Sequence, residues 1–102
     1  MASHVQSEGA RSVVNSTDRR RFEVLEGDQL AYLEYELFKD KVVFKHTEVP
    51  LGLEGRGLGG ALARNALDWA RTEGLRVIPV CPFVAAWIAR HPDYAELTRR
   101  TH

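Results

Sequence analysis

The most informative stretch of the chain is Leu53-Glu54-Gly55-Arg56-Gly57-Leu58-Gly59-Gly60-Ala61-Leu62. Four glycines within six residues form a turn that leads directly into a helical pattern. Glycines let backbone amides point into one concavity without obstruction by Cβ atoms, and a helix N-terminus adds partial positive charge. The stretch therefore predicts a nest of N–H groups suited to a pyrophosphate.

Three strand-like segments precede this turn. Residues 22–25 form a short apolar run, residues 29–38 alternate apolar and polar side chains, and residues 41–49 end at Pro50. Such alternation is typical of half-buried strands. The short connections between the segments predict an antiparallel meander.

After the turn the apolar period becomes that of a helix. Residues 58–73 carry an apolar stripe, and the pair Gly74-Leu75 predicts a left-handed C-cap that ends the helix. Residues 77–80 then predict a short buried strand, reached by a parallel crossover, and residues 83–90 predict a second helix.

Pro79 lies inside the last predicted strand and has no N–H to donate to a neighbouring strand. Two readings are open. The missing hydrogen bond lets two strands splay and open a slot between them, or Pro79 lies on a sheet edge.

Length and charge indicate one small globular domain. The chain has 102 residues, with 14 Lys and Arg against 14 Asp and Glu, so no net field favours nucleic acid or a membrane surface. Residues 1–19 lack periodicity and predict a flexible tail, and residues 20–102 predict a single domain.

The cysteine and histidine content excludes other classes. Cys81 is the only cysteine, which rules out an intramolecular disulfide and indicates a reducing compartment. No apolar run approaches the ~20 residues of a membrane span, so we expect a cytoplasmic protein. The histidines and Cys81 show no ligand spacing, so we expect no metal site.

The glycine stretch resembles the coenzyme A pyrophosphate loop of GNAT acetyltransferases, written Gln/Arg-x-x-Gly-x-Gly/Ala. The match runs over residues 54–59, and Glu54 stands where the loop has Gln or Arg. The spacing excludes a G-x-G-x-x-G dinucleotide fingerprint, and the absence of a following G-K-[ST] excludes a P-loop.

Further motifs occur in the same order as in one branch of that family. They are His46-Thr47-Glu48-Val49-Pro50, Val77-Ile78-Pro79-Val80-Cys81-Pro82-Phe83-Val84 and His91-Pro92-Asp93-Tyr94. Over residues 22–97 the chain resembles the minimal, single-domain GNAT-like N-acetyltransferase family (YidJ-type, N-acetyltransferase domain-containing proteins). The resemblance implies an α/β (α+β) GNAT acyl-CoA N-acyltransferase-like fold: an antiparallel meander, a βαβ coenzyme A-binding unit and a short C-terminal helix.

The resemblance and the glycine turn together give the expected cofactor site. The residues expected to bind acetyl-CoA or coenzyme A are Thr47, Val49, Glu54, Gly55, Arg56, Gly57, Leu58, Gly59, Gly60, Cys81 and Phe83. Within this set, the Val49 backbone would polarise the thioester carbonyl, and Arg56 would pair with a phosphate. Trp87, four residues after Phe83, is read as core packing.

Three residues are candidates for catalysis. His46 and Glu48 lie two apart on one strand face, and either could take a proton from an attacking ammonium. Cys81 precedes a predicted helix, where a thiol becomes a better nucleophile; the alternative is a buried residue beside the cofactor. The resemblance also makes Tyr94 a candidate general acid.

The function expected from these residues is acetyl-CoA-dependent N-acetylation of a primary amine on a small molecule or peptide. Direct attack in a ternary complex is the simpler route, and a route through Cys81 is the second. The alternative class is a non-catalytic coenzyme A or acyl-CoA binding module. Neither nucleic acid nor a membrane is expected as a partner, and the oligomeric state is left open.

Overall fold

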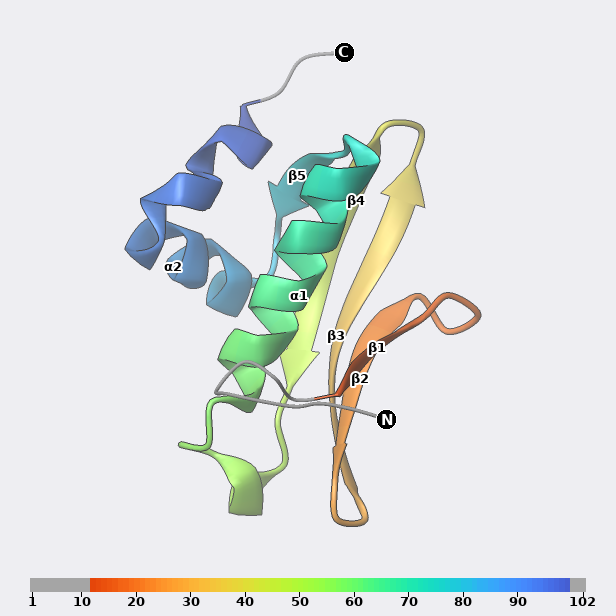
Figure 1. Ribbon diagram of the computed structural model, residues 1–102, viewed down its shortest axis with the longest axis vertical. Coiled ribbons are helices and arrows are strands. Elements are labelled where there is room, and N and C mark those ends of the chain that lie inside the picture. Colours follow the sequence, from red (N-terminus) through yellow and green to blue (C-terminus); the bar gives the residue numbers. More distant parts are fainter. Residues whose placement is uncertain (1–11, 100–102) are drawn as a thin grey trace.

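Segments in which apolar and polar side chains alternate form a sheet, and the long segment with an apolar stripe forms a helix beside it. A computed structural model describes residues 12–99. The elements are β1 (Val13–Ser16), β2 (Arg21–Glu26), β3 (Gln29–Phe38), β4 (Lys41–Glu48), η1 (Leu51–Leu53), α1 (Leu58–Glu73), β5 (Arg76–Pro79), α2 (Pro82–Arg90) and η2 (Pro92–Thr98). The strands form one sheet in the order β1-β2-β3-β4-β5. Figure 1 shows α1 lying along this sheet, with α2 and η2 gathered beside β5.

The predicted meander and crossover are confirmed. β1 to β4 pair antiparallel in sequence order, and β5 pairs parallel with β4. This arrangement is consistent with the GNAT-like α/β fold that the sequence indicated. Within residues 12–99, no helix is long and apolar enough to cross a membrane.

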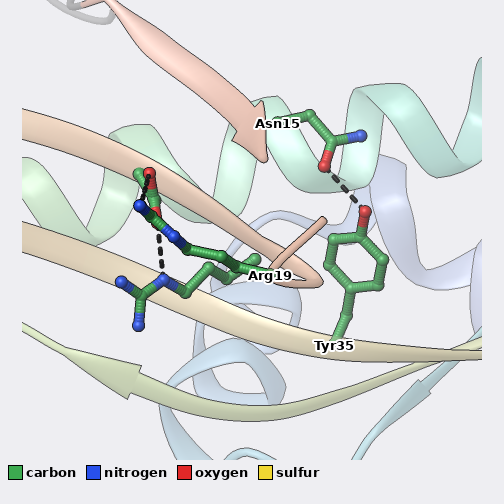
Figure 2. Close-up of polar contacts among 5 residues, drawn as sticks. Asn15, Arg19 and Tyr35 are labelled. Atoms are coloured by element: carbon green, nitrogen blue, oxygen red, sulfur yellow. Dashed lines mark hydrogen bonds and ion pairs between the residues drawn. The ribbon is translucent and has the colours of Figure 1, made fainter. Parts of the chain in front are cut away.

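The expectation of a flexible tail over residues 1–19 is wrong for β1. Val13–Ser16 pairs with β2, and the Asn15 amide oxygen accepts a hydrogen bond of 2.7 Å from the Tyr35 hydroxyl (Figure 2). A four-residue strand is too short to show periodicity, so its place in the sheet depends on partners distant in sequence. Residues 1–11 and 100–102 lie outside the described residues.

One face of the sheet carries the core. The inward residues of β2, β3 and β4 alternate and are buried against α1. Tyr35 lies at the centre, with its ring 5.1 Å from Trp69 and 5.6 Å from Phe22. Burial of these large apolar groups supplies most of the stabilisation in a domain of this size.

The opposite face carries polar side chains. Arg19 and Arg21 both pair with Glu23 there, at 3.1 and 2.6 Å (Figure 2). Burial opposes ionisation of Glu23, but the hydrogen bonds and charges of the two arginines outweigh it and lower the pKa of this carboxyl. The described helices contribute their buried side chains to the core on the other face.

Both ends of α1 are set by glycine. Gly57 at the N-cap has φ 78° and Gly74 at the C-cap has φ 71°. At the C-cap, the N–H of Leu75 donates to Ala70 and that of Gly74 to Arg71, which is the Schellman pattern. The predicted helix end is therefore confirmed.

The β4–β5 ladder ends at Phe44 and Pro79. Pro79 thus closes an edge strand, and after it the N–H of Cys81 donates to the Phe44 carbonyl at 2.8 Å. The expectation that Val80 is buried is wrong, since it is 61% exposed. β4 continues to Glu48, so its last residues have no described strand beside them on the β5 side.

Two buried tyrosines predict an alkaline loss of stability. Burial raises the pKa of Tyr35 and of Tyr94 above the ordinary 10.0, and for Tyr94 the hydrogen bond to Asp68 adds to the rise. The folded state holds these protons more tightly, so this stability is present below pH 10 and is lost as pH rises through the raised values. The free energy of unfolding in urea should fall between about pH 8 and about pH 11.

The double variant Tyr35→Phe and Tyr94→Phe should show a clearly smaller fall over the same range. Tyr32→Phe, on the polar face of the sheet, is the control and should keep the fall of the wild type. An equal fall in the double variant and the wild type would contradict the assignment.

Candidate functional site

A cavity of about 470 Å³ lies where the glycine loop, the start of α1 and α2 meet. A volume of this size is typical of small-molecule sites. The residues that line it are Val49, Leu53, Glu54, Gly55, Gly57, Leu58, Gly59, Gly60, Phe83, Trp87 and Arg90. Most of the residues expected from the sequence to hold a cofactor are therefore brought together.

The glycine loop turns because two of its residues adopt left-handed backbone. Gly55 has φ 85° and Gly57 has φ 78°, and a Cβ built on either meets nothing within 4 Å. The missing side chains therefore leave open space beside the start of α1. Because α1 has no side-chain N-cap, the amides of its first turn are available to a ligand.

The next two glycines have a different role. A Cβ on Gly59 would lie 2.7 Å from Phe83 Cζ, and one on Gly60 would lie 3.6 Å from Trp87 Nε1. Phe83 and Trp87 lie four residues apart, hence on one face of α2. The small residues let α2 approach the first turn of α1 closely, so they shape the cavity through packing.

This difference predicts unequal changes in stability for two matched substitutions. Gly60→Ala should stabilise the protein by about 0.5–1 kcal/mol, because alanine favours helix and its Cβ makes an ordinary contact. Gly59→Ala should fall short of that gain, because Phe83 must move. Urea unfolding and the NMR signals of the Phe83 ring test this. Equal gains with unchanged ring signals would contradict it.

Arg56 lies away from the cavity lining. Its Nη1 is 3.8 Å from Glu26 Oε2, at the end of β2. The charged side chains that do line the cavity are Glu54 and Arg90. The sequence signal for Arg90 was its spacing, since residues 83, 87 and 90 share one side of a helix.

Thr47 and Cys81 meet on the helix-covered side of the sheet. Thr47 pairs with the buried Leu33, and its Oγ1 lies 3.2 Å from Cys81 Sγ. Cys81 is buried at the N-cap of α2, followed by Pro82 at the first helical position. Neither Thr47 nor Cys81 lines the cavity.

His46 and Glu48 lie on the other face of the sheet. They pair with Glu34 and Tyr32 of β3, whose side chains alternate with the buried core residues. His46 Nε2 is 2.9 Å from Glu48 Oε1, and both side chains are about half exposed. The sheet therefore separates these two from Cys81.

Tyr94 belongs to the packing between α1 and η2. Its hydroxyl donates to Asp68 at 2.8 Å and accepts from Arg64 at 3.4 Å. It is buried and does not line the cavity. No group of three or more potential metal ligands occurs among the residues that the structure describes.

Comparisons with known proteins agree with the fold. The family described as GCN5-related N-acetyl-transferase matches residues 21–97. Protein NATD1 of Mus musculus is 33% identical over 93 residues, covering 88% of this chain and 84% of the mouse protein. Protein NATD1 of Bos taurus is 38% identical over 77 residues (72% and 68%), and that of Danio rerio 34% over 89 residues (82% and 81%).

Proposed function

The chain belongs to the GCN5-related N-acetyltransferase family, and on this premise we propose that it transfers the acetyl group of acetyl-CoA to a primary amine. The amine is carried by a small molecule or peptide, and attack is direct, within a ternary complex. The observation that carries the proposal is the cavity at the start of α1, with its glycine loop and uncapped first-turn amides.

The residues present fit coenzyme A. The open space beside Gly55 and Gly57 is a cradle that a Cβ would enter, and free amides at a helix start suit a pyrophosphate. Phe83, which is 37% exposed, offers apolar surface to the pantetheine arm, and the rest of the lining completes the wall. When bound, acetyl-CoA supplies an activated acetyl group whose bond to sulfur breaks as a bond to nitrogen forms.

His46 is proposed as the base that takes the ammonium proton. Its Nε2–H donates to Glu48 Oε1 at 2.9 Å, which leaves Nδ1 to accept a proton. Glu48 orients the ring. The amine would approach on the polar face of the sheet and the acyl group along the edge of β4 beyond Pro79, where Val49 N–H is the proposed oxyanion donor.

A route through Cys81 is the second proposed mechanism. Its thiol lies at the N-cap of α2 with Thr47 Oγ1 at 3.2 Å. Its sulfur would take the acetyl group as the bond to the coenzyme A sulfur breaks and coenzyme A leaves as the free thiol, and the amine would then take the acetyl group from Cys81. A non-catalytic coenzyme A or acyl-CoA binding module is the second candidate function. The exposure of His46 and Glu48, outside the cavity lining, favours that alternative.

The sheet, with β1 included, and its helices are proposed to act as one domain in the cytoplasm, a compartment suited to the single buried Cys81. No partner beyond acetyl-CoA and the amine enters this proposal.

Thiol release from acetyl-CoA, measured with a panel of primary amines, tests the function. The wild type should bind acetyl-CoA in calorimetry and release thiol only with a suitable amine. His46→Gln should lower kcat by about a hundredfold or more, and Cys81→Ala should retain turnover. Binding without thiol release for every amine would favour the binding module. Loss of turnover in Cys81→Ala, with acetylated Cys81 in the wild type, would favour the second route.

A further inference from the structure

Trp87 presents an unused hydrogen-bond donor to the cavity. The side chain is only 4% exposed, it lines the cavity, and its Nε1 lies 3.6 Å from where a Cβ of Gly60 would be. No described residue accepts a hydrogen bond from this N–H. Among the described residues, Arg76 Nε is the buried side-chain nitrogen without a partner, so the Trp87 N–H reaches the open space of the cavity. A ligand in the cavity can accept its hydrogen bond.

The direction of this N–H is fixed by packing on the ring. His91 stacks on the indole at 3.7 Å between centroids, with 13° between the planes. Tyr94 packs edge-on at 5.1 Å, and the Arg64 guanidinium lies 5.3 Å from the ring centroid. The indole therefore holds its donor toward the first turn of α1 without a polar partner of its own.

Arg90 adds a cation on the same side of α2. It lies three residues after Trp87, so the two side chains are neighbours on the helix surface, and both line the cavity. Arg21 and Arg71 have carboxylates within 4 Å, whereas no described carboxylate pairs with Arg90. Glu54 also lines the cavity, and its negative charge repels an anion there. The positive charge of the Arg90 guanidinium offsets this repulsion.

We propose that Trp87 and Arg90 make α2 the second wall of the phosphate site, with the indole N–H and the guanidinium donating to phosphate oxygens of coenzyme A. This inference rests on the proposed function, because it assigns a contact to the same ligand. The glycine loop donates backbone amides from one side, and α2 donates two side chains from the other. Both residues then determine specificity for a phosphorylated carrier over pantetheine.

The first test is NMR of the wild type, whose two tryptophans give two indole N–H signals. Coenzyme A should shift the Trp87 signal downfield and leave Trp69, packed against Phe22 and Tyr35, as the internal control. Pantetheine, which lacks phosphate, should not reproduce the shift. A Trp87 signal that moves no more than Trp69 at saturating coenzyme A would overturn its role.

The second test is calorimetry with matched variants. Arg90→Gln should weaken coenzyme A binding by about tenfold or more, and Trp87→Phe, which keeps a ring but removes the N–H, by about threefold to tenfold. Arg99→Gln, an exposed arginine outside the cavity lining, should bind as the wild type. Dephospho-coenzyme A, which lacks the 3′-phosphate, tells which phosphate Arg90 contacts. If Arg90→Gln binds dephospho-coenzyme A as tightly as the wild type does, Arg90 contacts the 3′-phosphate. If Arg90→Gln weakens binding of dephospho-coenzyme A as much as binding of coenzyme A, Arg90 contacts the pyrophosphate.

The two proposals fail in different ways. Wild-type binding of coenzyme A with unchanged affinity in both variants would overturn the role of α2 and leave the proposed function standing. A folded wild type that binds no coenzyme A would overturn both.

Discussion

Replacing Gly57 with leucine is expected to abolish coenzyme A binding, with a loss of at least about a hundredfold. The added side chain would enter the open space beside the loop and displace a phosphate from the first-turn amides. Charged hydrogen bonds contribute about 1.5–3 kcal/mol each, so loss of two accounts for that factor. Calorimetry with coenzyme A measures the effect.

Gly74→Leu is the matched control for backbone strain. Gly74 has φ 71° and Gly57 φ 78°, and neither has an atom within 4 Å of an added Cβ. Each substitution should therefore destabilise the fold by about 1–2 kcal/mol, measured by urea unfolding. Only Gly57→Leu should lose the ligand. Equal affinity in the two folded variants would remove the glycine loop from the site.

Phe44→Ala is expected to cost about 3–5 kcal/mol of the free energy of unfolding. Phe44 is fully buried in β4, packs edge-on against Tyr35 at 6.4 Å, and its carbonyl accepts the Cys81 N–H that begins the path to α2. In a small domain, a loss of this size removes much of a total near 5–15 kcal/mol.

Phe38→Ala makes the same chemical change at the end of β3, where the ring is 60% exposed. It should alter stability by no more than about 0.5 kcal/mol. Urea unfolding of both variants, with circular dichroism to confirm secondary structure, compares them. Similar losses at the two positions would contradict the assignment of the core to the α1 side of the sheet.

Local sequence patterns predicted most elements because each carries a short-range signal. Alternation located β3 within residues 29–38, and the Gly74-Leu75 pair located the end of α1. β1 was not predicted because a strand of four residues is too short to show an alternating pattern. Its pairing with β2 is a contact that forms only in the folded chain. Val80 was misassigned because the turn into α2 exposes a residue that apolar character alone would bury.

The candidate site also has a part that the sequence predicted and a part that it did not. The glycine loop was predictable, since its backbone conformation follows from residue type. The positions of His46 and Cys81 on opposite sides of the sheet were not predictable, because the β3–β4 register shifts between Phe44 and His46 and skips Lys45. Arg90 and the indole of Trp87 reach the cavity only because α2 returns against the start of α1.

The sequence by itself determined the order of the strands and helices after β1, the left-handed C-cap at Gly74 and the family resemblance, because these depend on residue type and spacing along the chain. Only the tertiary structure decided which face of the sheet carries each candidate residue, which glycines open the cavity and which admit Phe83 and Trp87. Those features depend on strand register and on the packing of one helix against another, and both are set by contacts between residues far apart in the sequence.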